Sequence, residues 1–316
     1  EIFTKEHGWI DFKDLTLDMH VGTMSKEGHI FEWQKPTEIT NQPYKGEIYN
    51  FKSRCFDVSV TPNHGMWVKY NQGINKHRNA QDYPQKTHIK YSLDWQRIDA
   101  KEVHDTWRKQ KWVLPNTVNG YKQIDFTEYV EVPRIEPKNK GMKERMNHSG
   151  TIDIKTFAAL VGWYVSEGHA AEKHVAISQY KDVNPENYQM IVDLAERIPV
   201  NKYYNDKSVV FQGIELSKFL KEICGHKSEN KFIPEFIKNN SKEVLEIIFD
   251  ALIRGDGHYK GHLGMESVGY RSNSKRLLED VAEIGLKLGY FVTYVNDKST
   301  CKQINMSKEQ TNPSLV

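Results

Sequence analysis

The chain has 316 residues, of which 38% are hydrophobic and 27% charged, and its mean hydropathy is −0.69. At about 100–200 residues per domain, this length predicts two domains, and the composition excludes a chain that is disordered throughout. No apolar run approaches the roughly 20 residues of a membrane span, and the first residues lack a signal-peptide pattern. We therefore expect a protein that is neither secreted nor in a membrane, and that works in the cytoplasm, or in the nucleus of a eukaryote.

The net charge and the spacing of the cysteines limit the classes of function that the chain can have. The 44 basic and 42 acidic residues leave a net charge of +2, so a nucleic-acid-binding protein would have to gather its basic residues on one face. The three cysteines, Cys55, Cys224 and Cys301, form no Cys-x-x-Cys pair. This spacing argues against a zinc ribbon or a disulfide framework and favours a reducing compartment.

Short strands are predicted for the first half. β-branched and aromatic residues nearly alternate in 31–40, 45–51 and 55–60, and turn signals separate these runs. Between 94 and 132, tryptophans and basic residues interleave, which fits either strands with solvated charges or a DNA-contacting extension. Residues 134–150 contain Pro, two Gly and a cluster of Lys and Arg, a composition typical of a linker between domains.

Helical periodicity begins after this linker. The spacing of apolar residues predicts five helices, at 155–166, 185–197, 214–223, 243–254 and 274–288. Short strand-like runs lie between them. The fold class we expect is therefore α+β, with a mostly β N-terminal domain followed by a mixed domain.

The mixed domain contains an internal duplication. One helix ends in Ser-Glu-Gly and another in Gly-Asp-Gly, and the acidic residues Glu167 and Asp256 are 89 positions apart. The starts of the helices that follow, Asn184 and Ser274, are 90 positions apart. This shared offset predicts an α-β-β-α-β-β-α unit made twice, with the two units related by a pseudo-twofold axis.

Small residues on the two acidic helices predict close packing. Ala158, Gly162 and Ser166 recur every four residues in the first helix, and Ala251 and Gly255 do so in the second. Small residues on one stripe let two helix backbones approach each other closely. The acidic residues at the ends of both helices would then meet.

Two carboxylates at adjacent helix C-termini repel each other and the negative end of each macrodipole. A divalent cation removes that repulsion, and Mg²⁺ suits a carboxylate pair that keeps most of its water. Such a metal, Mg²⁺ or another divalent cation, activates water against phosphodiesters. The alternative is that Glu167 and Asp256 are exposed terminal residues without a role.

Three segments carry a resemblance to a known family. They read LVGWYVSEG (160–168), NKFIPEFI (230–237) and FDALIRGDG (249–257). The first and third resemble the two motifs of LAGLIDADG homing endonucleases, and the second is similar to the segment before the second motif. The second motif departs from the family pattern at its start and at Ala251, where Gly is usual.

The resemblance, which covers about residues 150–306, implies a function. It implies a monomer with two four-stranded saddles on a long double-stranded DNA site, and metal-dependent cleavage of both strands. Glu167 and Asp256 would be the metal ligands, and Lys231 matches a basic position often near the active site.

The sequence Thr61-Pro62-Asn63-His64 follows a strand-like run in the first half. A Thr hydroxyl and a His three residues later can converge on one carbonyl, where they stabilise an oxyanion or protonate a leaving amide nitrogen. The alternative is an ordinary turn with a surface histidine.

Residues 1–23, together with Thr61 and His64, resemble the Hint fold of inteins. The resemblance implies protein splicing, with flanking host segments (exteins) as partners and with Thr61 and His64 assisting at the upstream junction. It gives the layout 1–133 for the splicing domain, 134–150 for the linker, 151–310 for the endonuclease, and 311–316 for a tail returning toward the splicing domain.

The junction residues depart from that pattern. Glu1 is not the Cys or Ser nucleophile that splicing needs, and no His-Asn pair ends the chain, so we expect a fragment of an intein. Two further hypotheses stay open. One is a DNA-binding protein on a LAGLIDADG-like scaffold that does not cut, and the other is a Hint autoprocessing fragment with an inactive second domain.

Overall fold

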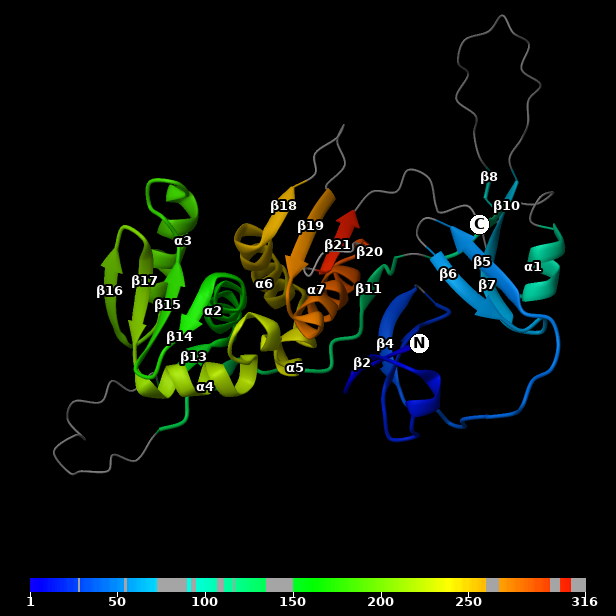
Figure 1. The fold of residues 1–316 in the computed structure, drawn as a ribbon, viewed down its shortest axis with the longest axis horizontal. Coiled ribbons are helices and arrows are strands. Elements are labelled where there is room, and N and C mark those ends of the chain that lie inside the picture. Colours follow the sequence, from blue (N-terminus) through cyan, green and yellow to red (C-terminus); the bar gives the residue numbers. More distant parts are fainter. Residues whose placement is uncertain are drawn as a thin grey trace, which may run out of the picture.

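The computed structural model describes residues 1–27, 29–53, 56–72, 90–91, 95–106, 111–115, 117–134, 150–259, 267–295 and 302–307. Its mixed helices and sheets confirm the α+β class (Figure 1). In this part of the chain, no helix is long and apolar enough to cross a membrane.

The second half contains two copies of one unit. The first consists of α2 (Ile154–Glu167), β14 (Gly168–Ala170), β15 (His174–Ser178), α3 (Pro185–Glu196), β16 (Asn201–Asn205), β17 (Ser208–Gln212) and α4 (Ile214–Cys224). The second consists of α6 (Lys242–Gly255), β18 (Gly257–Tyr259), β19 (Ser267–Ser272), α7 (Lys275–Lys287), β20 (Phe291–Val295) and β21 (Lys302–Ser307). Their antiparallel sheets have the matching orders β14-β15-β17-β16 and β18-β19-β21-β20. The duplication is therefore present in the fold.

The five helices predicted from periodicity occur, each with ends within one residue of the predicted ones. Capping explains three of the starts, because Asp153, Ser241 and Ser274 accept bonds from backbone N–H groups of the first turns of α2, α6 and α7. Asn184 differs, since its side chain donates to Gln179 instead. The first copy has the predicted α-β-β-α-β-β-α order, while a closing helix of the second copy and the tail at 311–316 lie outside the described residues.

The first half forms two β-rich parts. One is the sheet β11-β4-β3-β1-β2, made of Gly120–Tyr121, Ile30–Gln34, Val21–Met24, Ile2–Thr4 and Gly8–Ile10. The other contains β5 (Tyr49–Ser53), β6 (Phe56–Val60), β7 (Gly65–Gln72), β8 (Lys90–Tyr91), β9 (Gln96–Asp99), α1 (Ala100–Thr106) and β10 (Lys111–Val113). This second part has its own core, which includes Phe51, Val68 and Trp112.

The segment before the linker packs with the second half. Strand β12 (Tyr129–Glu131) pairs antiparallel with β13 (Thr151–Asp153), and Val130 and Val132 belong to the same core as α2 and α6. The Tyr121 hydroxyl donates to the Asn240 carbonyl. The domain boundary at residue 133 stays a prediction, and these contacts join residues on its two sides.

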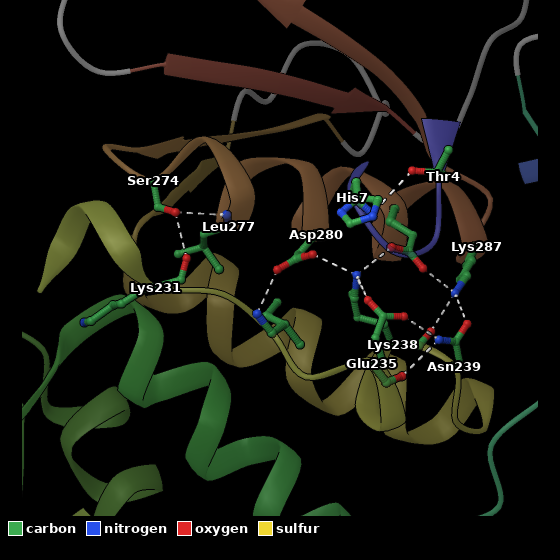
Figure 2. A network of polar contacts seen from close by, with 12 residues as sticks. Thr4, His7, Lys231, Glu235, Lys238, Asn239, Ser274, Leu277, Asp280 and Lys287 are labelled. Atoms are coloured by element: carbon green, nitrogen blue, oxygen red, sulfur yellow. Dashed lines mark hydrogen bonds and ion pairs between the residues drawn. The ribbon is translucent and has the colours of Figure 1, made fainter. Parts of the chain in front are cut away.

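A buried charge network joins α7 to α5 (Glu235–Lys238) (Figure 2). Lys238 Nζ lies 2.8 Å from Asp280 and 2.9 Å from Glu283, and Lys287 Nζ lies 2.6 Å from Glu283. Burial lowers the pKa of Lys238, but Glu283, Asp280 and Glu235 outweigh it and hold that pKa well above its ordinary value. The network therefore keeps Lys238 charged inside the protein, whereas burial lowers the pKa of Lys287 despite its contact with Glu283.

The N-terminal sheet covers this network. Trp33 Nε1 donates to the Asn239 side chain at 3.0 Å, and Lys287 Nζ lies 5.7 Å from the centre of the Trp33 ring and 5.5 Å from that of Phe31. An ammonium over an aromatic face is attracted by the ring quadrupole. These contacts dock β4 on the second copy of the duplicated unit.

Candidate active site

Helices α2 and α6 lie side by side at the centre of the duplicated half (Figure 1). A Cβ added to Gly162 would lie 2.7 Å from Ala251 Cβ and 3.1 Å from the Ile248 carbonyl oxygen. A Cβ added to Gly255 would lie 2.5 Å from Ser166 Cβ. The small-residue stripes thus face each other, and Ala251 is accommodated because its partner is Gly162.

The two acidic residues stand at the same end of this helix pair. Glu167 is the last residue of α2, and Asp256 directly follows α6. A Cβ on Gly255 would lie only 3.5 Å from Glu167 Cγ, so the two helix ends touch. The structure therefore brings together the acidic residues that the sequence predicts as a pair.

The pair is electrostatically unfavourable without a cation. The Asp256 residue is exposed as a whole, but protein atoms exclude much of the water around its carboxyl group. This desolvation and then the Glu167 charge raise the pKa of Asp256 to about 6, while Lys231 lowers it. Burial also raises the pKa of Glu167, and Lys231 again opposes it. Each raised pKa means that the ionised carboxylate is disfavoured, and a bound cation would reverse this.

Lys231 joins the acidic pair from the segment that precedes α5. Its Nζ donates to the carbonyl oxygens of Tyr164 at 2.9 Å and Gly168 at 2.8 Å, so it binds the C-terminal end of α2. Burial lowers the pKa of Lys231, partly offset by Asp256 and Glu167. The ammonium is therefore fixed beside both carboxylates.

A metal at this point would have few protein ligands. Among the described residues, no group of three or more His, Cys, Asp and Glu side chains could hold a metal ion. Two carboxylates with water in the remaining positions suit Mg²⁺, which keeps several of its waters. Glu167 and Asp256 thus fit a hydrated divalent cation.

The strand register identifies one row of side chains on each sheet that points away from the helices. Directly paired residues share a face, so His169, Ala176, Val210 and Tyr203 form a row on the first sheet. The neighbouring row, with Ile177 and Val209, is buried against the helices. The first row is therefore on the open face.

The corresponding row of the second sheet contains His258, Gly269, Asn305 and Thr293. On the same face, Arg271 Nε donates to Gln303 Oε1 at 2.8 Å. Both open faces thus carry side chains able to form hydrogen bonds with base edges or phosphates.

Sequence reasoning did not identify these open-face residues, because strand register is not visible in one sequence. One signal was available. Each acidic residue is followed by Gly-His, which makes His169 and His258 equivalent in the two copies.

Thr61 and His64 lie in the turn between β6 and β7. The His64 N–H donates to the Thr61 carbonyl at 3.0 Å, and the Thr61 hydroxyl donates to Asn63 Oδ1 at 2.9 Å. The His64 residue is exposed. The turn brings Thr61 and His64 together, and their part in acyl transfer stays a prediction.

Two of the three cysteines, Cys55 and Cys301, lie outside the described residues. The third, Cys224, is a buried free thiol. In the proposed 94–132 extension, Trp95 is described, and the Lys69 ammonium lies 4.5 Å from its ring centre. A DNA contact by this segment stays a prediction.

No protein-family model matches the chain. It is 22% identical over 314 residues to an ATP-dependent Clp protease proteolytic subunit of Chlamydomonas moewusii, covering 92% of this chain and 28% of that protein. It is 28% identical over 185 residues to a DNA-directed RNA polymerase subunit beta C-terminal section of Stigeoclonium helveticum, covering 47% and 17%. It is 23% identical over 191 residues to a DNA gyrase subunit of Mycobacterium gordonae, covering 56% and 32%. The chain spans less than a third of each relative.

Among solved structures, the chain is similar to those of the homing endonuclease I-DmoI. A set of mesophilic variants matches with a TM-score of 0.35 and 13% identity, covering 48% of this chain and 88% of that one. A complex of I-DmoI with DNA and Mn matches with a TM-score of 0.36 and 14% identity, covering 48% and 89%. A likeness of this degree assigns neither the fold nor the function of this chain.

Proposed function

We propose that this chain is a site-specific, metal-dependent DNA endonuclease of the LAGLIDADG type that cuts both strands. The observation that carries the proposal is the meeting of Glu167 and Asp256 at the touching ends of α2 and α6, beside buried Lys231. Two equivalent halves, each with one carboxylate and one open sheet face, suit the two strands of a duplex.

The chain's own residues have separate tasks in this proposal. Glu167 and Asp256 would hold divalent cations, which supply activated water and neutralise charge on the scissile phosphates. Lys231 fixes the end of α2 and places a positive charge beside the site. The open-face rows of the two sheets bind base edges and the phosphate backbone.

The carboxylate pair favours a nuclease over a DNA-binding protein that does not cut. Beside phosphates, two carboxylates weaken binding by like-charge repulsion unless a cation is present. Burial and then the neighbouring Glu167 charge raise the pKa of Asp256, so the two carboxylates also repel each other. A protein that only binds DNA gains nothing from it.

The test is incubation of the full chain with a library of long duplexes, first in Mg²⁺ and then in Ca²⁺. Cutting in Mg²⁺ with binding in both ions is the expected result. Binding in both ions without cutting would instead support the DNA-binding hypothesis. An absence of binding would leave Hint autoprocessing as the remaining hypothesis.

A second candidate function concerns the first half. We propose that the chain is the nuclease-bearing part of an intein, an insert whose first half takes part in splicing from flanking exteins. Three differently named enzymes share a segment with this chain over 17–32% of their lengths, which suits a segment carried within unrelated hosts.

The test restores a Cys-led upstream segment, a downstream His-Asn and host flanks. His64→Ala should then slow the upstream step by about 10²–10⁴-fold, the usual contribution of a positioned proton donor, while Thr61→Ala slows it less. DNA cutting serves as the internal control. An upstream step that is equally fast without His64 would leave the turn without a catalytic role.

A further inference from the structure

A hydrogen-bonded row of side chains lies on the open face of the second sheet. Arg271 on β19 is paired directly with Gln303 on β21, and its Nε donates to Gln303 Oε1 at 2.8 Å. The Gln303 Nε2 group in turn donates to Asn305 Oδ1 at 2.9 Å. Gln303 is only 6% exposed, whereas Arg271 is exposed. The row therefore holds an exposed arginine through a nearly buried amide.

The strand register fixes the side of the sheet on which Arg271 lies. Its neighbours Tyr270 and Ser272 are both buried, so they point toward the helices and Arg271 points away from them. Tyr270 pairs with Gly257, the residue directly after Asp256. Arg271 therefore lies on the open face, at the end of the sheet that is near the acidic pair.

The bond to Gln303 decides which edge of the guanidinium can meet a ligand. Because Nε is engaged, the edge formed by the two terminal nitrogens is the one that can donate two parallel bonds. Such an edge fits two neighbouring acceptors. In the major groove, guanine alone presents two acceptors side by side, N7 and O6, whereas adenine combines an acceptor with a donor and each pyrimidine presents a single polar group.

The first copy has no equivalent of this arginine. The register of the two sheets places Ser178 at the position of Arg271 and Ser208 at the position of Gln303. A serine has one short hydroxyl and cannot form two parallel bonds to one base. The two open faces therefore differ in the base contacts that they can make at this position.

Building on the proposed function, we propose that Arg271 selects a guanine in the arm of the target that lies on the second sheet, with Gln303 as the residue that positions it. The other arm has no such requirement at the equivalent position, because Ser178 cannot form a bidentate contact. Since Arg271 lies near Asp256, the selected guanine belongs to the inner part of its arm, close to the cut.

The test selects target sequences from a pool of long randomised duplexes that the full chain binds in Ca²⁺. The parent should enrich guanine at one inner position of one arm. Arg271→Met keeps the aliphatic stem and removes the guanidinium. Affinity is then compared on duplexes that differ only at this position. The preference for guanine should fall by about 5–150-fold, the usual effect of one bidentate contact, while preferences at all other positions stay unchanged.

A double-mutant cycle tests the part of Gln303. Gln303→Leu should reduce the guanine preference of the parent and change nothing further in Arg271→Met, because both changes act on one contact. A lower melting temperature with an unchanged base preference would overturn the positioning role. The matched control is Lys275→Met, which removes a positive charge from the surface of α7 and should leave every base preference in place.

Two outcomes overturn the role of Arg271. One is a guanine preference that is absent from the parent or that survives in Arg271→Met. The other is a uniform loss of affinity for all sequences with a salt slope smaller by about one, which would identify a phosphate contact instead. A parent chain that binds no duplex would overturn the proposed function itself, so the failures are distinguishable.

Discussion

Two carboxylates account for most of the proposed chemistry. We expect Glu167→Gln and Asp256→Asn each to abolish DNA cutting while target binding in Ca²⁺ remains, because each change keeps the side-chain shape and removes one ligand charge. The measurement is strand cleavage beside a gel-shift titration. Glu243→Gln is the control, since Glu243 also lies on α6 but pairs with Lys155 at the surface. Near-normal cutting by either site variant would contradict the metal-ligand assignment.

The raised pKa of Asp256 predicts how metal affinity depends on pH. Metal binding needs the ionised carboxylate, so protons compete below a pKa of about 6. We expect Mn²⁺ affinity to be nearly constant above pH 7 and to fall by up to about tenfold per pH unit below 6. Affinity that stays flat down to pH 5 would contradict the perturbed environment of Asp256.

The same group affects stability in the opposite sense when no metal is present. A carboxyl whose pKa is raised on folding stabilises the protein at low pH, and that contribution is lost as pH rises through about 6. Relative to the parent, Asp256→Asn should therefore gain stability between pH 4 and 6. Denaturant unfolding across this range, without divalent ions, measures the difference.

Among the elements, the α2–α6 seam sets the distance between the two halves. Gly162→Ala places a methyl group against Ala251 and the Ile248 carbonyl, so we expect a loss of about 1–3 kcal/mol in the free energy of unfolding. Ala251→Gly alone should cost about 1 kcal/mol, the usual effect of glycine in a helix.

The double variant tests whether the two residues act as a pair. Gly162→Ala with Ala251→Gly moves the methyl group from α6 to α2 and removes the clash. Its loss should be smaller than the sum of the single losses, as in a coupled double-mutant cycle. Strict additivity in urea unfolding would show that the helices do not meet at these residues.

The stability of helix α7 depends on buried charged side chains whose i, i+4 spacing would normally indicate a surface position. Lys287→Met leaves Glu283 with one cation fewer in the interior, and we expect a loss of about 3–5 kcal/mol in stability. Lys275→Met, on the same helix, breaks a pair with Glu279 whose lysine is exposed, and should cost at most about 1 kcal/mol. Equal effects in thermal unfolding would contradict the buried network.

The helices were predictable from sequence because apolar spacing and end signals agree. The short strands β14 and β18 were not, since three residues carry too little alternation to separate them from loops. Glu283 and Lys287 show a second limit. A pair spaced i, i+4 normally indicates a solvated helix face, and only tertiary packing reveals that both are buried.

The site was predictable to a similar extent. The repeated acidic residue identified Glu167 and Asp256, because a fixed offset survives in one sequence. The open-face rows were hidden by contrast, since they depend on strand register, which one sequence does not reveal.

For the whole molecule, DNA affinity should depend strongly on salt even though the net charge is only +2. A duplex held along two sheets needs many Lys and Arg contacts with phosphates, and each contact adds about −0.9 to the slope of log K against log salt. We expect a slope of about −5 or steeper for the target duplex. A slope near zero in fluorescence anisotropy would exclude nucleic acid as the partner.

Contacts between the first and second halves of the chain affect where a domain boundary can be drawn. Strand β12 and Tyr121 belong to the packing of the second half, and Trp33 reaches Asn239. No composition shift marks these contacts in the sequence, because they join residues more than a hundred positions apart, except for the β12–β13 pair. The linker composition alone therefore says little about which residues fold together.

Joining two copies in one chain has a consequence for the DNA sequence that the proposed nuclease would select. A homodimer presents identical side chains to both half-sites and so selects a palindrome. Here, the equivalent rows differ, with Tyr203 and Val210 in one copy against Thr293 and Asn305 in the other. Each half of the proposed nuclease would therefore read its own bases, and its preferred target should be a sequence whose left and right arms are unrelated.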